Sequence, residues 1–303
     1  MSGLQESIDA RELIALALRE DLGAAPPTAA ADLTAAWTVP AAAQAQAEIV
    51  ARAPGVLAGI GLLDQIYGML DPRVRVAAAR ADGADLAAGE VVARVQGPAR
   101  SLLAGERTVL NFLQRLSGVA TLTRRFVAAV AGTGARITDT RKTTPGWRQL
   151  EKYAVRAGGG VNHRMGLYDA VLIKENHAAC AGGVAAAVRQ ARQAAAAAGR
   201  HVPLFAEAES LAEVRQLVEV RPDRIMLDDM PLEDVRQAVR LIRAGLPGTQ
   251  IEATGGVRLE NVRQLAETGV DLISVGSLTH SAPALDLSML FRSEAPDPAA
   301  PAA

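Results

Sequence analysis

The feature that most constrains the fold is an alternation of short apolar runs with longer helical stretches after residue 135. The apolar runs are ARIT, DAVLI, VPLFA, DRIML, TQIEA and DLISV. Helical patterns separate or follow them near 147–157, 182–199, 209–220, 232–244 and 258–268. Strands that alternate with helices form parallel βαβ units, because parallel neighbours need a crossover connection. The pattern predicts an α/β fold, as a barrel or an open doubly wound sheet.

The first hundred residues follow a different pattern. The stretch IDARELIALALREDLG predicts a helix, with Asp9 and Glu12 placed like a capping box. Short β-type runs broken by Gly and Pro follow: QAEIVA, GVLAGIG, RVRVAAA and EVVARVQG. A helical passage from 101 to 130 is long enough for one bent helix or two, and Ser117 and Gly118 are the expected break. We therefore expect a small α+β region before the alternating part.

These changes of pattern divide the chain into domains. We predict an N-terminal α+β domain over 1–116 and an α/β domain over 117–282. A helix near 283–292 is expected to pack back on the first domain, and the tail over 293–303 is expected to be disordered.

Composition excludes several classes of protein. Lys and Arg number 32 against 33 Asp and Glu, so the chain is not a strongly basic protein of the kind that coats nucleic acid. The single cysteine, Cys180, excludes an intrachain disulfide framework and a multi-cysteine metal site. Neither a basic-then-apolar leader nor a membrane-length apolar run is present in the sequence. We expect a cytoplasmic protein, with Cys180 a small buried residue.

Cations concentrate in RKTTPGWRQLEKYAVRAGGGVNHR, which carries one acid, Glu151. In this stretch, the three adjacent glycines allow a tight fold that would turn His163 and Arg164 back into a pocket. Arg148, Lys152 and Arg156 have near-helical spacing, so we expect a solvated or subunit-facing helix surface there.

Polar or glycine residues follow nearly every predicted strand. They are Asp139 to Lys142, Lys174, Glu207, Asp228, Thr254 to Gly256, and Gly276 to Ser277. Loops are often polar, but Lys174, Glu207 and Asp228 directly follow apolar runs, where an unpaired charge would be costly. Because active sites of such folds lie at the carboxyl ends of the strands, these residues are expected to line one site.

The expected site has two halves. The cations suit an anion with more than one carboxylate or phosphate. The carboxylates of Glu207 and Asp228 suit a divalent cation or sugar hydroxyls, and Mg²⁺ is preferred for hard oxygen ligands that also touch phosphate. The turns ATGGV and SVGS let backbone N–H groups approach a phosphate. The pattern predicts a site that joins a polyanionic acid to a phosphorylated sugar.

Longer motifs resemble one family. DTRKTTPGWRQLEKYAVRAGGGVNHRMGLYDAVLIKENH, EAES, MLDDM, EATGGV and VGSLTHS resemble quinolinate phosphoribosyltransferase, as do REDLG, ADLT, ARAPGVLAGIG and GERTVLNFLQRLSG. The resemblance covers almost the whole chain apart from the tail. It implies an incomplete α/β (TIM-like) barrel beside an N-terminal α+β sandwich-like domain. It also implies an Mg²⁺-dependent enzyme of NAD biosynthesis that acts on quinolinate and phosphoribosyl pyrophosphate, built as a homodimer or a hexamer (trimer of dimers) with shared active sites.

The resemblance also implies roles for individual residues. Those that match the quinolinate pocket are Thr140, Arg141, Lys142, His163, Arg164 and Lys174, with Arg107 supplied by the neighbouring subunit. Glu207 and Asp228 match acids near the ribose and metal, and the metal contact could pass through water. The residues that match the 5′-phosphate cradle are Thr254, Gly255, Gly256, Val275, Gly276 and Ser277. The sequence departs from the family at Ala31 and Asp229, where Gly and Asn are usual.

Other functions stay open at this point. A related barrel protein could act on another substrate, such as nicotinate, although a monocarboxylate would need fewer cations. A non-catalytic sensor of a phosphorylated metabolite would not require both Glu207 and Asp228. His280 could contact the phosphate or an interface, and Asp139 could pair with the cations and set their geometry.

Overall fold

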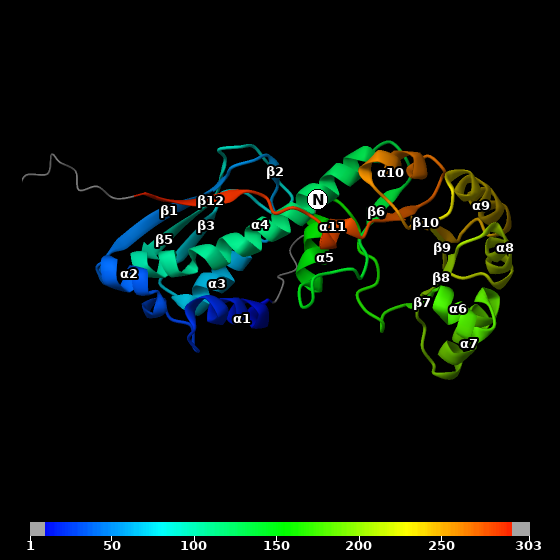
Figure 1. Ribbon diagram of the computed structural model, residues 1–303, viewed down its shortest axis with the longest axis horizontal. Helices are drawn as coiled ribbons and strands as arrows, with labels where there is room; N and C mark the ends of the chain where they lie inside the picture. The colour runs from blue at the N-terminus through cyan, green and yellow to red at the C-terminus, as the bar shows by residue number, and fades with distance from the viewer. Residues whose placement is uncertain (1–9, 293–303) are drawn as a thin grey trace, which may run out of the picture. The chain divides into compact units, whose positions relative to one another are not determined.

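The computed structural model describes residues 10–292 (Figure 1), and this part of the chain forms two compact units. The first unit comprises residues up to Leu122, Gln149–Gly158, and the chain from Ala282 onward. The second comprises Thr123–Arg148 and Gly159–Ser281. The predicted division into 1–116 and 117–282 placed 149–158 in the barrel domain, whereas its contacts group this segment with the first unit.

The first unit is built on a four-stranded antiparallel sheet in the order β12-β1-β5-β3. Its strands are β1 (Gln44–Ala51), β3 (Arg75–Ala78), β5 (Val91–Pro98) and β12 (Leu287–Arg292). A separate pair is formed by β2 (Gly55–Val56) and β4 (Asp85–Leu86). The helices are α1 (Arg11–Leu22), η1 (Ala29–Ala31), α2 (Leu33–Thr38), α3 (Leu62–Leu70) and α5 (Arg148–Ala157). The long helix α4 (Ala99–Ala129) belongs to this unit as far as Leu122.

The expected break at Ser117 and Gly118 is wrong, because α4 continues through both residues. Gly118 serves close packing instead of a break: a Cβ at this position would lie 2.0 Å from the carbonyl oxygen of Pro283. The Ser117 hydroxyl accepts a hydrogen bond from the backbone N–H of Ala58 at 3.1 Å. The two small residues therefore let other segments approach the helix.

The predicted helix near 283–292 is also wrong, because Leu287–Arg292 forms strand β12. It pairs antiparallel with β1, with Met289 opposite Ile49. Leu287 and Met289 are buried, so side chains at a spacing of two face the core, as a strand requires. The segment does return to the first unit, as expected. Residues 293–303 lie outside the described part of the chain.

Three further expectations concern single residues. Helix α1 is preceded by Ala10, which makes no side-chain cap, and Asp9 of the expected capping box lies outside the described residues. Lys152 was expected on a helix surface, but it is fully buried on α5 beside Glu151, which accepts a hydrogen bond from Arg115 at 2.7 Å. Cys180 was expected to be buried and is exposed.

The second unit contains a six-stranded parallel sheet in the order β6-β11-β10-β9-β8-β7. The strands are β6 (Arg136–Thr138), β7 (Val171–Ile173), β8 (Leu204–Ala208), β9 (Arg224–Asp228), β10 (Gln250–Thr254) and β11 (Leu272–Ser274). All six were predicted from the apolar runs. The order leaves β6 and β7 at opposite ends of the sheet, so the predicted incomplete α/β barrel is confirmed.

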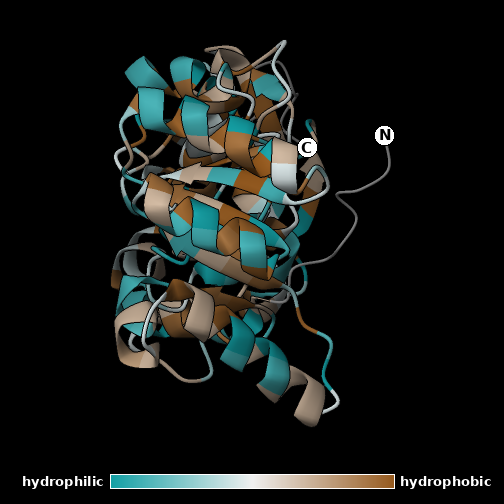
Figure 2. Cartoon of the chain, turned by 90° about the vertical axis from the view of Figure 1, so that its right-hand side faces the viewer, coloured by the Kyte–Doolittle hydropathy of each residue, from teal (hydrophilic) through white to brown (hydrophobic). Residues whose placement is uncertain are grey.

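The helices of this unit are α6 (Glu175–Ala181), α7 (Val184–Ala197), α8 (Leu211–Val220), α9 (Leu232–Gly245), α10 (Leu259–Ala266) and α11 (Ser277–His280). Figure 2 looks onto this end of the chain and shows hydrophilic and hydrophobic bands along the outer helices. Such banding is typical of helices that cover a sheet with one face and meet water with the other. No helix among residues 10–292 is long and apolar enough to cross a membrane.

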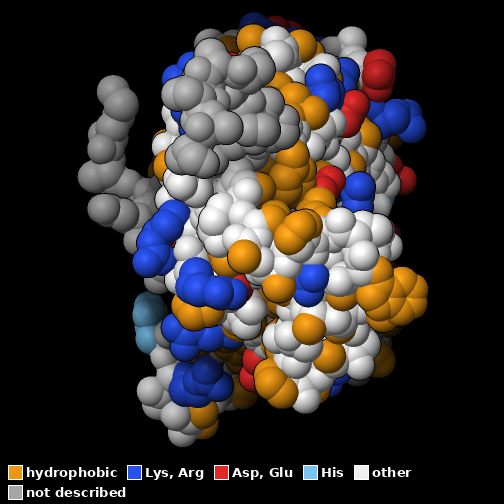
Figure 3. All heavy atoms as spheres, turned by 90° about the vertical axis from the view of Figure 1, so that its left-hand side faces the viewer, with side chains coloured by type: hydrophobic (Ala, Val, Ile, Leu, Met, Phe, Trp, Pro, Cys, Tyr) orange, Lys and Arg blue, Asp and Glu red, His pale blue; other side chains and the backbone are white. Residues whose placement is uncertain are grey.

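Exposed large hydrophobic side chains in the described part of the first unit are Leu16, Leu33, Trp37, Leu290 and Phe291. Figure 3, in which the left-hand side of Figure 1 faces the viewer, shows hydrophobic side chains interspersed with Lys and Arg.

Candidate active site

The register of the parallel sheet brings alternate residues of neighbouring strands onto one face. Glu207 of β8 lies opposite Met226 of β9, and Asp228 lies opposite Thr254 of β10. Side chains alternate along a strand, so residues two apart point to the same face of the sheet. The apolar part of this face includes Leu172, Phe205 and Met226, which form a buried cluster. The charged residues therefore lie at the carboxyl ends of the strands, and the apolar residues that precede them on the same face form a buried cluster.

A cavity of about 320 Å³ lies at these carboxyl ends. It is lined by Thr140, Arg141, Lys142, His163, Arg164, Leu172, Lys174, Glu207, Met226, Asp228, Thr254, Gly255 and Ser274. The structure thus gathers ten of the fifteen predicted site residues around one space. The other five, Arg107, Gly256, Val275, Gly276 and Ser277, are not among its lining residues within the described chain.

The loop after α5 reaches the cavity because it is anchored to β6. Gly159 has φ +93°, which favours glycine, and Val161 forms a parallel bridge with Thr138. The buried carboxylate of Asp139 accepts a hydrogen bond from the backbone N–H of His163 at 2.9 Å. Asp139 therefore positions this loop, and the turn predicted from the three glycines carries His163 and Arg164 to the cavity.

Two arginines bring buried, unsatisfied donors to the site. The Nε atoms of Arg141 and Arg164 are buried and have no hydrogen-bond partner. Arg164 donates through Nη1 to the carbonyl of Ala170 at 2.9 Å, which fixes its guanidinium. Burial and then the nearby charge of Arg141 lower the pKa of Arg164. Buried donors without acceptors are unfavourable, so this half of the cavity is complementary to an anion.

The acidic half is partly neutralised. Lys174 Nζ lies 2.5 Å from Glu207 Oε1, while Glu207 Oε2 is buried without a hydrogen-bond partner. Burial raises the pKa of Glu207, and Lys174 opposes that rise. Burial also raises the pKa of Asp228, with Asp229 adding repulsion and Lys174 opposing it. Two carboxylates with raised pKa at one cavity are suited to a cation or to hydroxyl donors.

The carboxylates fit Mg²⁺ only with help from another ligand. Among residues 10–292 no group of three or more His, Cys, Asp and Glu side chains could hold a metal ion. Mg²⁺ is often bound by one or two carboxylates together with substrate phosphates and waters. The buried, unpartnered Oε2 of Glu207 is a suitable hard oxygen donor for such a site.

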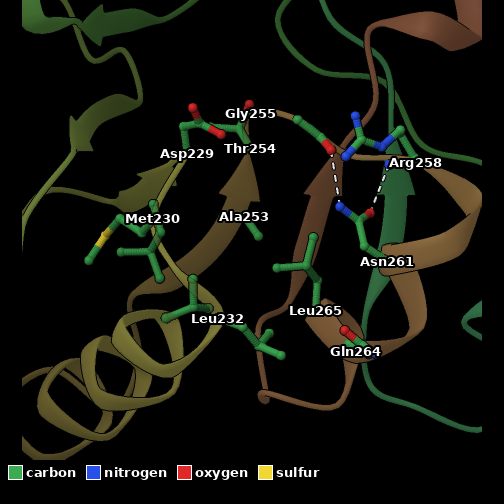
Figure 4. Close-up of a pocket in the computed structure, with 13 residues that line it drawn as sticks. Asp229, Met230, Leu232, Ala253, Thr254, Gly255, Arg258, Asn261, Gln264 and Leu265 are labelled. Carbon is green, nitrogen blue, oxygen red and sulfur yellow. Dashed lines mark hydrogen bonds between the residues drawn. The ribbon is translucent and has the colours of Figure 1, made fainter.

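Both glycines of the ATGGV turn have left-handed backbone conformations. Gly255 has φ +83° and Gly256 has φ +56°, and a Cβ on Gly255 would lie 2.6 Å from the backbone nitrogen of Asp229. Figure 4 shows Asn261 holding this turn: its amide donates to the carbonyl of Gly256 at 3.0 Å and its oxygen accepts from the N–H of Arg258 at 2.8 Å. The turn is therefore rigid and tightly packed.

The turn also lines a second cavity, of about 330 Å³, whose lining residues are drawn in Figure 4. Leu232, Met230, Ala253 and Leu265 are among its apolar lining residues. It shares Thr254 and Gly255 with the first cavity. Asp229, one of the two departures from the family pattern, lines this second cavity and has φ +50°.

The turn after β11 contacts Lys142, which lines the first cavity. A Cβ on Gly276 would lie 3.1 Å from Cδ of Lys142, and the Thr279 hydroxyl donates to the carbonyl of Lys142 at 2.7 Å. Val275 is buried and donates its N–H to Thr138 at 2.9 Å. Ser277 is the first residue of α11, and the exposed His280 contacts Ser281 at 2.6 Å. Arg107 is exposed on α4 in the first unit.

Three lining residues were not predicted: Leu172, Met226 and Ser274. The buried Glu252 and its ion-pair partner, the partly buried Arg224, were also missed. The alternation of side chains along a strand would have indicated the face on which both lie. On β9, Arg224 points to the same face as Asp228, and on β10, Glu252 points to the same face as Thr254.

Comparison with known proteins gives matches over most of the chain. Residues 32–117 match the family described as "Quinolinate phosphoribosyl transferase, N-terminal domain", and residues 119–290 match "Quinolinate phosphoribosyl transferase, C-terminal domain". The chain is 46% identical over 244 residues to the "Probable nicotinate-nucleotide pyrophosphorylase [carboxylating]" of Bacillus subtilis, covering 80% of this chain and 82% of that protein. It is 43% identical over 284 residues to the "Nicotinate-nucleotide pyrophosphorylase [carboxylating]" of Mycobacterium leprae, covering 92% and 96%.

A solved structure has the same fold. The nicotinate-nucleotide pyrophosphorylase from Francisella tularensis superimposes with a TM-score of 0.86 at 33% identity, covering 96% of this chain and 100% of that one.

Proposed function

The chain belongs to the quinolinate phosphoribosyltransferase family, and we propose that it converts quinolinate and phosphoribosyl pyrophosphate to nicotinate mononucleotide, pyrophosphate and CO₂ in NAD biosynthesis. One observation of the site supports this function above the others: Arg141 and Arg164, each with a buried Nε that has no hydrogen-bond partner, line the same cavity as Glu207 and Asp228. A dianionic acid fits the first group, and a ribose that becomes positively charged fits the second.

The cationic residues bind and orient the acid. Quinolinate carries two carboxylates, and two arginines with Lys142 offer enough positive charge to offset the desolvation of both. Leu172 and Met226 provide the apolar surface against which a pyridine ring can lie. The acid would then be held with its ring nitrogen directed at the sugar, which makes attack effectively intramolecular.

The acidic residues act on the ribose. As the bond between C1 and pyrophosphate breaks, positive charge develops on the sugar, and the carboxylates of Glu207 and Asp228 stabilise it. The electron pair leaves with pyrophosphate while the lone pair of the pyridine nitrogen forms the new bond to C1. Glu207 and Asp228 would also hold Mg²⁺, which supplies charge neutralisation for the leaving pyrophosphate.

Decarboxylation follows from the same cation. The new N–C bond makes the ring a pyridinium, so the electrons left on C2 when CO₂ departs are stabilised beside N⁺. A proton then replaces the lost carboxylate at C2. The protein holds the remaining carboxylate, keeps the ring in place and excludes water. The 5′-phosphate is assigned to the turns at Thr254–Gly256 and Val275–Ser277, because α10 begins shortly after the first turn and α11 begins at Ser277 of the second.

The assembly and location are part of this proposal. Arg107 would reach the cavity of a second copy, which requires a homodimer or a hexamer of three dimers. A cytoplasmic location stays a prediction. Sedimentation of the Arg107→Ala variant against the unmodified chain would separate a role in assembly from a role in catalysis.

One assay tests the reaction. The protein is incubated with Mg²⁺, phosphoribosyl pyrophosphate and either quinolinate or nicotinate, and CO₂ and mononucleotide are followed. We expect CO₂ and mononucleotide in equal amounts from quinolinate only. Mononucleotide from nicotinate alone would contradict the proposal, as would tight binding of phosphoribosyl pyrophosphate without turnover of either acid.

A further inference from the structure

A buried polar network lies behind the cavity wall. Glu252 of β10 has no exposed surface. Its Oε2 accepts a hydrogen bond from Arg224 Nη1 at 2.7 Å, and its Oε1 accepts one from the hydroxyl of Ser274. The same Oε1 lies 3.7 Å from Nε2 of His163. His163 and Ser274 line the cavity, whereas Glu252 is not among its lining residues.

Burying these charged groups costs free energy, so packing alone does not explain them. Burial raises the pKa of Glu252, and Arg224 and Ser274 oppose that rise. Arg224 is itself fixed, with its guanidinium 4.2 Å from the centre of the Phe205 ring and two further hydrogen bonds to Gln250. Apolar residues of similar volume often replace a buried ion pair without loss of stability. The charges are therefore better explained by the groups that they orient.

The contacts of His163 define which ring nitrogen carries the proton. Its Nδ1 accepts a hydrogen bond from the backbone N–H of Arg164 at 2.8 Å. A nitrogen that accepts a hydrogen bond carries no proton, so the neutral imidazole has its proton on Nε2. That N–H faces the carboxylate of Glu252, at a distance that gives electrostatic attraction without a full hydrogen bond. Phe205 contacts the ring edge-on, with centroids 5.7 Å apart.

We propose that Glu252 is a positioning residue for the bound acid: its carboxylate holds His163 as the Nε2–H tautomer in one orientation, and holds the Ser274 hydroxyl at the same wall. Because His163 Nδ1 accepts the Arg164 N–H, the same interaction fixes the backbone from which the Arg164 guanidinium extends. The inference rests on the proposed function, since it assigns this wall to the acid substrate.

Glu252→Gln separates orientation from packing. The amide has the shape of the carboxylate but offers only one acceptor oxygen to three donors: Arg224, Ser274 and His163. With that oxygen on Arg224, the NH₂ group faces His163, which must then accept on Nε2 and carry its proton on Nδ1. A proton on Nδ1 conflicts with the N–H of Arg164, so the ring and the adjacent backbone must move.

The kinetic expectation is a selective loss for the acid. In Glu252→Gln, KM for quinolinate should rise roughly tenfold or more, because misaligned donors forfeit hydrogen bonds to a charged group. KM for phosphoribosyl pyrophosphate should stay within about twofold. A merely structural role would lower the fraction of active enzyme, and hence kcat, without this selectivity. Glu219→Gln, which removes a charge from an exposed position on α8, is the matched control and should change neither constant.

A spectroscopic measurement on the unmodified protein tests the same inference without turnover. The chain has four histidines, so ¹⁵N-labelled imidazoles can be resolved and His163 assigned from the His163→Asn variant. We expect the Nε2–H tautomer for His163 at neutral pH, and its loss in Glu252→Gln.

The outcomes distinguish this inference from the proposed function. An Nδ1–H tautomer in the unmodified protein would overturn the inference, as would an unchanged KM for quinolinate in a folded Glu252→Gln variant. Should that variant not fold, the spectrum of the unmodified protein decides. Absence of turnover by the unmodified protein would count against the proposed function and would leave the tautomer assignment standing.

Discussion

Replacing Lys174 with Met tests the balance of charge in the cavity most directly. Lys174 Nζ lies 2.5 Å from Glu207 Oε1, in a chain whose lysines number three: Lys142, Lys152 and Lys174. Met keeps much of the apolar stem and removes the ammonium. The substitution leaves Glu207, whose side chain is 5% exposed, with no ammonium partner at either oxygen.

The magnitude follows from the geometry. Unit charges about 4 Å apart attract by roughly 4 kcal/mol at an effective dielectric of 20, before desolvation. The Lys174 side chain is 44% exposed, so solvent screening reduces the interaction. A net loss of about 2–3 kcal/mol, the range for a hydrogen bond to a charged group, corresponds to roughly 100-fold in kcat/KM for quinolinate.

The pH dependence gives a second readout of Lys174→Met. Lys174 opposes the rise in the pKa of Glu207 that burial causes, so removing Lys174 raises this pKa further. Glu207 must be ionised to stabilise the ribose cation, and activity is lost as pH falls through its pKa. The acid limb of the kcat/KM profile should therefore move to higher pH in the variant.

The assay measures kcat/KM for quinolinate from about pH 4 to pH 9, so that the acid limb lies within the range. Arg215→Met, which removes an exposed charge from α8, is the control and should match the unmodified enzyme. If Lys174→Met retained kcat/KM within about twofold and kept its acid limb in place, the assigned charge balance would be refuted.

Three further perturbations have defined outcomes. Asp228→Asn should abolish turnover yet raise Tm by about 1–2 °C at neutral pH, after allowance for screening. The pKa of Asp228 is raised in the folded protein, so ionising Asp228 lowers the stability of the folded state as pH rises from the unfolded pKa through the folded one. The gain in Tm of Asp228→Asn should therefore vanish at pH below both pKa values. A lower Tm of the variant at neutral pH would contradict this sign. Gly255→Ala should raise KM for phosphoribosyl pyrophosphate more than tenfold by distorting the φ +83° turn, with KM for quinolinate as the internal control. Gly118→Ala should cost about 1–3 kcal/mol or more in urea unfolding because its Cβ meets the Pro283 carbonyl, whereas Gly132→Ala tests the φ effect alone without a close contact.

Local sequence pattern was most informative for the barrel. Each of the six apolar runs became a parallel strand, because β-type runs with intervening helices allow few arrangements other than βαβ units. The pattern was least informative where a short apolar segment is compatible with either a helix or a strand. Residues 283–292 were predicted as a helix and pair with β1 as a strand, since a partner strand far away in sequence supplies the hydrogen bonds.

The site shows the same division. Glu207 and Asp228 could be predicted because a charge directly after an apolar run indicates a strand end. For Glu252 and Arg224 the period of two indicates only the face of the sheet on which they lie, because their charges compensate one another only after neighbouring strands pair. Lys152 was assigned to a solvated or subunit-facing surface for a similar reason: helical spacing gives the face of a helix but not what covers it.

The sequence by itself determined the class of fold and the kinds of chemical group available, since strand and helix periods and residue types are local properties. Only the tertiary structure decided which charges meet. Arg141, Arg164, Lys174, Glu207 and Asp228 come from separate loops and strand ends, and the parallel register of the sheet brings them to one cavity. The physical reason is that burial and charge neutralisation depend on neighbours in space, and residues more than 80 positions apart become neighbours only when the parallel sheet has formed.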